Sequence, residues 1–302
     1  MTGHLRIAPT RSLGQSIDRP RALTRRFGNA AGSRAYDLLV PSGYEGALLP
    51  LVVMLHGCSQ SSRDFDIGTG MDRVAEEQGF LVAYPDQPRS ANIAKSWNWF
   101  RDEDQKRDEG EPSILAGLTR EIMAAFNVDP ARVYVAGLSS GGAAAAVMAL
   151  AYPDIYAAVG IHSGLAGGSA GSMSVAFSTM RRGALLRPHQ ATHPLPTIVF
   201  HGDRDTTVSP VNGDQAIAQA QPDGDLNITT VDGRSDGGMA YTRTILTEPD
   251  GKWSSEQWVL HGGGHAWAGG HPSGSHTDPT GPDASREMLR FFMTHAKDDG
   301  AY

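Results

Sequence analysis

The segment Arg132-Val-Tyr-Val-Ala-Gly-Leu-Ser-Ser-Gly-Gly-Ala-Ala-Ala-Ala-Val-Met-Ala-Leu150 decides the fold of this 302-residue chain. It begins with an apolar run typical of a buried strand and ends with small apolar residues typical of a helix. Between them lies the pattern G-x-S-x-G. A strand, a sharp turn and a helix in this order indicate a nucleophile elbow, which lifts Ser139 above the sheet edge. Gly137 and Gly141, two residues before and after Ser139, leave room for that turn.

Ser140 is the alternative nucleophile in the same motif. The small residue that the turn needs two positions later is present as Gly142. Two positions earlier, however, stands the bulky Leu138. We therefore assign the nucleophile to Ser139.

Short apolar runs alternate with longer amphipathic stretches along the rest of the chain. This alternation predicts an α/β fold with a mostly parallel central sheet flanked by helices. Strands are expected at 34–41, 49–55, 79–84, 132–136, 157–161, 197–200 and 257–260. Helices are expected at 68–78, 112–126, 141–152 and 284–295.

Two further features concern the second half of the chain. Asp250-Gly251, between residues 241–247 and 253–260, predicts a β-hairpin. Residues 165–195 have no strand pattern and lie between two expected strands. They are predicted to form a small cap over the site, with a plain surface insertion as the alternative.

Composition narrows the class of protein. A net charge of −7 gives no support to nucleic-acid binding. No run of 18 apolar residues predicts a membrane span. Residues 1–33 are predicted to be a basic N-terminal arm, and residues 34–302 the catalytic domain. The arm has one acidic residue, Asp18, against six arginines: Arg6, Arg11, Arg19, Arg21, Arg25 and Arg26.

The chain has one cysteine, Cys58. An intrachain disulfide and a cysteine-based zinc site are therefore both excluded. A lone cysteine fits a reducing compartment, and no apolar signal segment follows Met1. Both features favour a cytoplasmic location, whereas removal of a signal segment would allow an extracellular one.

A serine hydroxyl needs a base and an orienting acid, which follow the serine along the chain in this kind of fold. The strand expected at 197–200 leads into His201-Gly-Asp-Arg-Asp205. Asp203 and Asp205 are both candidates for the acid. Asp205 lies further into the loop and can reach across the sheet edge, whereas Asp203 is typical of a turn. We assign the acid to Asp205.

The histidine is expected after the last strand, 257–260. That strand runs into His261-Gly-Gly-Gly-His265, and the three glycines let the loop fold back over the elbow. His265, at the far end, is the assigned base. His261, at the strand end, is the alternative and is more typical of a packed or hydrogen-bonded histidine.

Four histidines lie within 16 residues, namely His261, His265, His271 and His276. Imidazole is a common metal ligand. Their glycine-rich spacing lacks the rigid helical pattern of a zinc site. We expect no metal and no cofactor.

The negative charge that develops on an attacked carbonyl oxygen needs two backbone donors. The amide of Ser140, directly after the nucleophile, is the first candidate. The second is expected after the first buried strand, in Leu55-His-Gly-Cys58, where the amide of Cys58 is assigned. A plain strand-to-helix connection is the alternative for this loop.

Aromatic residues cluster near two of these motifs. Trp97, Trp99 and Phe100 lie within five residues, and Trp267 follows His265 closely. We assign these four residues to an apolar wall that binds the substrate. Core packing is the alternative for the first three.

These motifs together resemble the polyhydroxybutyrate depolymerase family of serine esterases, which is akin to feruloyl and acetylxylan esterases. The resemblance covers roughly residues 35–295. It rests on LHGCSQSSRDF at 55–65, SWNWF at 96–100, GLSSGGA at 137–143, HGDRDTTV at 201–208 and GGGHAWAGG at 262–270.

The resemblance implies an α/β-hydrolase fold with Ser139, Asp205 and His265 as the catalytic triad and the Cys58 amide in the oxyanion site. One position departs from the family pattern. Family members often carry a cysteine at the position of Ser96, able to pair with the cysteine that corresponds to Cys58. That partner is absent here.

The implied activity is hydrolysis of a carboxylic ester through an acyl-enzyme. Expected substrates are hydroxyalkanoate oligomers, or alternatively small aryl esters or acylated sugars of the feruloyl and acetylxylan type. A peptidase or amidase on the same scaffold is a second enzyme hypothesis. A non-catalytic binding protein is a third hypothesis, against which the intact serine, acid and histidine argue.

Overall fold

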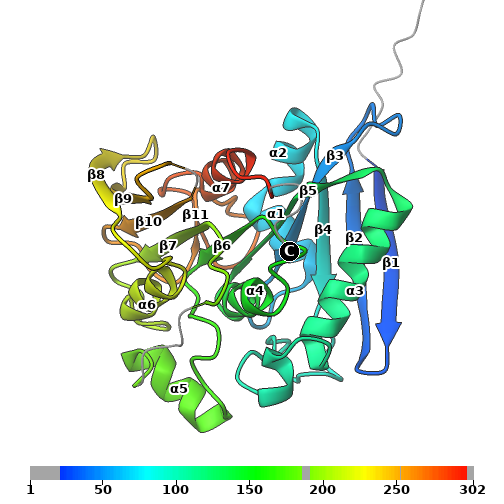
Figure 1. Cartoon of the computed structure of the whole chain (residues 1–302), viewed down its shortest axis with the longest axis horizontal. Helices are drawn as coiled ribbons and strands as arrows, with labels where there is room; N and C mark the ends of the chain where they lie inside the picture. The colour runs from blue at the N-terminus through cyan, green and yellow to red at the C-terminus, as the bar shows by residue number, and fades with distance from the viewer. Residues whose placement is uncertain (1–20, 186–190, 252, 298–302) are drawn as a thin grey trace, which may run out of the picture.

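A ten-stranded β-sheet runs through the molecule (Figure 1). The computed structural model describes residues 21–185, 191–251 and 253–297. The strand order across the sheet is β1-β2-β4-β3-β5-β6-β7-β10-β9-β8. These strands are β1 (Arg21–Asn29), β2 (Gly32–Val40), β3 (Leu49–Leu55), β4 (Leu81–Asp86), β5 (Val128–Leu138), β6 (Ala158–His162), β7 (Thr197–Gly202), β8 (Asn227–Arg234), β9 (Ala240–Thr247) and β10 (Ser254–Leu260).

The central strands of the sheet are parallel. β4, β3, β5, β6, β7 and β10 all run in one direction. Two antiparallel strands close each edge, β1 with β2 on one side and β8 with β9 on the other. The carboxyl ends of the parallel strands therefore lie along one edge, where open sheets of this type bind their ligands.

Helices cover both faces of the sheet (Figure 1). The helices are α1 (Ser62–Thr69), α2 (Met71–Gln78), α3 (Gly110–Ala125), α4 (Ser140–Ala151), α5 (Met173–Arg182), α6 (Val211–Gln219) and α7 (Ala284–Met293). A single turn of 3-10 helix, η1, spans Asp102–Gln105, and a short parallel pair is formed by β11 (Trp267–Ala268) and β12 (Thr277–Asp278). No helix in the described ranges combines the length and apolarity needed to cross a membrane.

The continuous apolar character of β3 follows from burial on both faces. Leu51 and Val53 pack in the core beneath α3, α4 and α6. Val52 and Met54 point the opposite way and pack in the core beneath α1, α2 and α7. A parallel strand covered by helices on both sides has no solvent face, so no alternation appears in its sequence.

The turn between β5 and α4 is very tight. Ser139 has φ 57° and ψ −116°, a conformation that a residue with a side chain rarely adopts. A Cβ atom on Gly141 would lie 2.0 Å from the carbonyl oxygen of Leu55. One on Gly137 would lie 2.4 Å from the Gly141 carbonyl carbon. The two glycines are therefore needed because α4 begins directly against β3.

Most of the expected elements are confirmed, with shifted ends. All seven strands are present, and the expected hairpin is β9 with β10. The prediction of a single helix at 68–78 is wrong. Gly70 has a left-handed conformation (φ 58°) and separates α1 from α2. β1, β8, α5 and α6 had no expected counterpart.

The predicted N-terminal arm is wrong for residues 21–33. Residues 21–29 form β1, which pairs along its whole length with β2. Most of its side chains are exposed, so it lacks the apolar pattern of a buried strand. Phe27 nevertheless packs against the core, with its ring next to Gly117 of α3. The remainder of the arm, residues 1–20, lies outside the described residues.

The substitution Gly141→Ala tests the close approach of α4 to β3. The new methyl group meets backbone atoms that cannot rotate away, so we expect a loss of more than about 3 kcal/mol in the free energy of unfolding. Gly264→Ala is the matched control, because nothing lies within 4 Å of a Cβ there. Urea unfolding gives both values. Equal stability of the two variants would contradict this packing.

Candidate active site

Ser139 stands at the carboxyl end of β5, on the turn described above. Its backbone N–H donates to the carbonyl oxygen of His162, at the end of neighbouring β6, over 2.9 Å. Ser140 is already the first residue of α4. The turn position of the elbow therefore belongs to Ser139, which favours it over Ser140.

Asp205 and His265 form a close pair. They lie on the loops after β7 and β10, which are adjacent parallel strands. His265 Nδ1 lies 2.7 Å from Asp205 Oδ2, and the Asp205 side chain is fully buried. Its other oxygen, Oδ1, accepts the backbone N–H groups of Thr207 and Val208. The carboxylate thus holds the imidazole with Nδ1 as donor.

Electrostatics keep the Asp205 carboxyl ionised. Burial by itself raises its pKa, but hydrogen bonds from His201 and His265 outweigh burial and leave the pKa well below its ordinary value. An ionised carboxylate beside an imidazole stabilises the protonated ring that a general base becomes.

Asp203 and His261, the alternative candidates for the acid and the base, pair with each other. His261 Nδ1 lies 3.0 Å from Asp203 Oδ2, and His261 Nε2 lies 2.9 Å from Thr242 Oγ1. Asp203 Oδ1 also accepts the N–H of Gly262. This second pair is largely exposed, whereas the Asp205–His265 pair is largely buried. The structure therefore separates the two histidines and assigns a different aspartate to each.

Two buried histidines that the sequence analysis did not single out support this site. The His201 ring donates from Nε2 to the carbonyl oxygen of Val208 and lies 3.5 Å from Asp205 Oδ2. The His162 ring accepts the Ala268 N–H at Nε2 and stacks on Trp267. Both lie at the carboxyl ends of buried strands, His162 in β6 and His201 in β7, a position that could have indicated a role.

An apolar cavity of about 170 Å³ opens beside Ser139. Trp99 and Phe100 line it, and their role as a wall that binds substrate stays a prediction. The other lining residues are Cys58, Asn92, Ala94, Ser96, Ser139, Ser140, Leu165, Met173, Ala176, Phe177 and Met180. Four of these belong to α5, which lies within the segment expected to form a cap. No charged side chain of the described residues lines this cavity.

Two of the four aromatic predictions are wrong. Trp97 is 0 % exposed and donates its indole N–H to the carbonyl oxygen of His56. Trp267 is 1 % exposed, donates to Ser285 Oγ and packs against the ring of Phe65. Neither lines the cavity. Their short sequence distance from Trp99 and His265 did not reveal that their side chains point into the core.

The predicted oxyanion donors both border the cavity beside Ser139. Ser140 is in the first turn of α4, where backbone N–H groups have no acceptor within the helix. In the loop after β3, the N–H groups of Gly57 and Ser59 are occupied by Gln60 Oε1 and Ala94 O. Within the described part of the chain, no hydrogen bond uses the Cys58 N–H.

The four clustered histidines do not converge. Nowhere in residues 21–185, 191–251 and 253–297 do three His, Cys, Asp or Glu side chains lie together as a metal site requires. Cys58 is a free thiol, and its Sγ donates to the carbonyl oxygen of Ala94.

The parallel sheet, the elbow at Ser139 and the two loops that follow define an α/β-hydrolase fold. The chain belongs to the esterase PHB depolymerase family, whose sequence profile matches residues 34–237. The fold class and the family expected from the sequence are confirmed.

Curated relatives share part of this chain. Poly(3-hydroxyalkanoate) depolymerase C of Paucimonas lemoignei is 35% identical over 212 residues, which are 66% of this chain and 51% of the depolymerase. Feruloyl esterase B of Neurospora crassa is 27% identical over 261 residues, 80% of this chain and 82% of that enzyme. The chain thus spans about half the length of the depolymerase.

A solved structure of similar fold is the acetyl xylan esterase from Aspergillus awamori. It matches with a TM-score of 0.67 and 19% identity, over 91% of this chain and 99% of that one. At this identity the likeness concerns the fold.

Two buried histidines make the stability of the fold depend on pH. Burial lowers the pKa of His56 to about 4, and burial followed by the nearby His201 and His265 lowers that of His162 to about 3. The unfolded chain takes up these protons below its ordinary histidine pKa of about 6.5. Stability is therefore complete above that pH and is lost as the pH falls.

Burial raises the pKa of Asp66 and of Asp104 to about 6, which stabilises the fold as the pH falls and opposes the histidines. In the variant with Asp66→Asn and Asp104→Asn we therefore expect the free energy of unfolding to decrease below pH ~6.5, with a limiting slope of about 1.4 kcal/mol per pH unit for each histidine. Asp205 adds to the loss below pH ~4, because its lowered pKa favours the folded state only while it is ionised. Urea unfolding at a series of pH values between 7 and 4 measures this slope. A flat profile would contradict the burial of neutral imidazoles.

Proposed function

We propose that the chain is a serine carboxylic-ester hydrolase with Ser139 as nucleophile, His265 as general base and Asp205 as the orienting acid. The observation that carries the proposal is the 2.7 Å Asp205–His265 pair on the loops after β7 and β10, at the sheet edge where the turn after β5 presents Ser139. Family membership supports the same reaction class.

Each member of this set has a defined role. Asp205 accepts from His265 Nδ1, which leaves Nε2 of the imidazole as the nitrogen that takes the proton of Ser139 Oγ. The serine oxygen then attacks the ester carbonyl carbon. The imidazolium, stabilised by Asp205, gives its proton to the departing alcohol. His265 next takes a proton from water, which hydrolyses the acyl-enzyme and frees Ser139.

Negative charge on the carbonyl oxygen is stabilised by the amides of Ser140 and Cys58. The support is that both residues border the cavity together with Ser139, and that neither amide is engaged elsewhere in the loop or helix. Donors fixed before the reaction stabilise the transition state without reorganisation.

The cavity next to Ser139 favours uncharged, apolar ester groups. Its apolar wall includes Trp99 and Phe100 together with Met173, Phe177 and Met180 of α5. Hydroxyalkanoate esters fit this description, and the depolymerase relative supports that substrate class. Aryl esters fit it too, which keeps the feruloyl type of substrate within the same proposal.

A substrate panel separates these classes. We compare kcat/KM for hydroxybutyrate oligomers, methyl ferulate, acetylated xylan, an aryl ester and an aryl amide with the same acyl group as the aryl ester. The proposal expects the hydroxyalkanoate and aryl esters to exceed the amide by orders of magnitude. A preference for the amide would replace the esterase assignment by that of an amidase.

The nucleophile is tested by Ser139→Ala. Removal of the attacking oxygen should lower kcat by about 10⁴–10⁶ while the fold is retained, as in other serine triads. Steady-state hydrolysis of a p-nitrophenyl ester measures kcat, and circular dichroism checks the fold. Turnover close to wild type would remove Ser139 from the mechanism.

The acid is tested by comparing Asp205→Asn with Asp203→Asn. Each aspartate accepts from Nδ1 of one histidine on the loop after β10, Asp205 from His265 and Asp203 from His261, so the two variants form a matched pair. Asp205→Asn should reduce kcat by roughly 10⁴, because an amide stabilises neither the required tautomer nor the imidazolium. Asp203→Asn should leave kcat within about tenfold of wild type. The reverse order would assign the reaction to the Asp203–His261 pair.

A further inference from the structure

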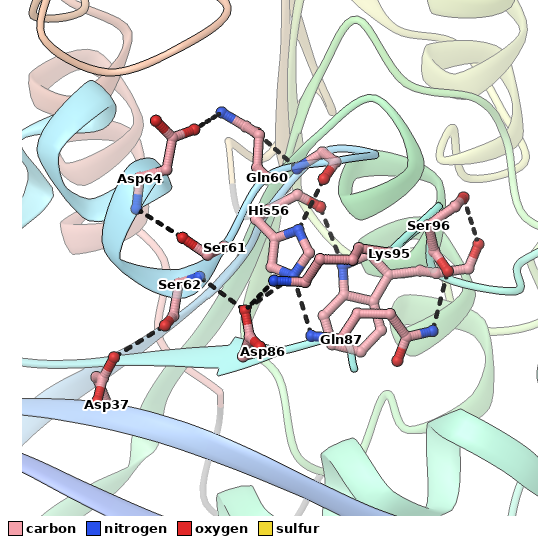
Figure 2. A network of polar contacts seen from close by, with 12 residues as sticks. Asp37, His56, Gln60, Ser61, Ser62, Asp64, Asp86, Gln87, Lys95 and Ser96 are labelled. Atoms are coloured by element: carbon pink, nitrogen blue, oxygen red, sulfur yellow. Dashed lines mark hydrogen bonds and ion pairs between the residues drawn. The ribbon is translucent and has the colours of Figure 1, made fainter. Parts of the chain in front are cut away.

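A buried histidine that the proposed chemistry does not use lies directly beneath the oxyanion loop. His56 ends the run from β3 into this loop and is 0 % exposed. Figure 2 shows its ring between the backbone of the loop and the segment that follows β4. His56 Nδ1 lies 2.7 Å from the carbonyl oxygen of Gly57, and Nε2 lies 3.0 Å from the backbone nitrogen of Gln87.

These two contacts define the tautomer of the ring. A carbonyl oxygen can only accept, so Nδ1 carries the proton that bonds the Gly57 oxygen. The Gln87 N–H can only donate, so Nε2 carries no proton. His56 is therefore a neutral imidazole that donates in one direction and accepts in the other.

The charged groups around His56 do not disturb this state. Asp86 Oδ1 lies 3.8 Å from Nε2, but this carboxylate oxygen already accepts from Lys95 and from the Ser62 backbone N–H, each over 3.0 Å (Figure 2). Burial lowers the pKa of His56 to about 4, so the ring remains neutral near pH 7.

The hydrogen bond to Gly57 constrains the next residue as well. The Gly57 carbonyl and the Cys58 N–H belong to one planar peptide group, and in a trans peptide they point in opposite directions. Fixing the carbonyl toward His56 therefore fixes the Cys58 N–H away from it. Cys58 borders the cavity beside Ser139, whereas His56 does not line it.

We propose that His56 is a positioning residue, whose Nδ1–H orients the Gly57–Cys58 peptide so that the Cys58 N–H faces the developing oxyanion. This inference rests on the proposed ester hydrolysis and adds a residue to it. His56 does not touch substrate. It acts on the reaction only through the peptide that it holds.

Neighbouring contacts complete the constraint. The Gly57 N–H donates to Gln60 Oε1, and Gln60 Nε2 donates to Asp64 and to Ser275. The carbonyl of His56 accepts the indole N–H of Trp97. The peptides on both sides of Gly57 are thus held by side chains, and the Cys58 N–H is the only backbone N–H of residues 57–59 without a hydrogen-bond partner among the described residues.

An oxyanion donor stabilises the transition state more than the ground state, so its loss lowers kcat and changes KM little. His56→Gln should lower kcat by about 10²–10³, because the longer side chain does not place a donor at the Nδ1 position. His56→Asn places an amide N–H close to that position and should retain activity within about tenfold of wild type. Affinity for an aryl trifluoromethyl ketone, which forms a tetrahedral adduct, should fall in parallel with kcat/KM.

His295→Gln is the matched control. His295 follows α7 and is also buried, and its Nδ1 bonds the carbonyl oxygen of Phe291 in α7, among residues that do not border the cavity. Loss of the His295 imidazole should lower the free energy of unfolding but leave kcat and the affinity for the trifluoromethyl ketone unchanged. Equal activity of His56→Asn and His56→Gln, or a loss of kcat in the control equal to that in His56→Gln, would overturn the inference.

Nitrogen NMR of the wild-type chain gives a readout that needs neither activity nor a folded variant. At pH 7 His56 should be protonated at Nδ1 and unprotonated at Nε2, and the opposite tautomer would overturn the inference. An inert wild-type chain with the expected tautomer would instead contradict the proposed ester hydrolysis and leave the His56–Gly57 contact in place.

Discussion

The contact of α4 with the end of β3 is the constraint on which the rest of the structure depends. Gly141 lies so close to the Leu55 carbonyl that no side chain fits between them. This contact forces the chain to reverse within one residue and gives Ser139 its positive φ. Strain of this kind persists only where surrounding packing determines it, and here two cores on opposite faces of the sheet do so. The strained conformation at Ser139 is thus a consequence of the packing of the sheet and the helices. The residues of the turn could not impose it alone.

Parallel strand order then brings distant parts of the chain to the same edge. Asp205 and His265 are 60 positions apart in sequence, yet they pair over 2.7 Å because β7 and β10 are neighbours. Buried neutral histidines connect these loops to the strands beneath them. His162 links β6 to the segment after His265, and His56 links β3 to the segment after β4. A buried imidazole serves this purpose well, because one ring both donates and accepts at fixed directions.

The sequence predicted those features that depend on local pattern. The elbow at Ser139 and the placement of Asp205 and His265 after apolar strands follow from strand, turn and glycine signals that lie within a few residues. The orientation of Trp97 and Trp99 could not be predicted in this way. They are two residues apart, yet Trp97 bonds the His56 carbonyl in the core while Trp99 lines the cavity. Between them, Asn98 donates from its backbone and from its side chain to Glu111 of α3, a partner that no local pattern indicates. β1 was missed for a related reason, since an exposed edge strand is defined by its partner β2 more than by its own residues.

The central claim is that Ser139 is the one serine activated for covalent catalysis. Mass spectrometry of the intact chain after reaction with a fluorophosphonate, followed by peptide mapping, tests it most directly. The account predicts a single adduct per chain, located on Ser139, whose formation is slowed by orders of magnitude in His265→Ala. An adduct on Ser140, or labelling of Ser139 at the same rate without His265, would contradict the account.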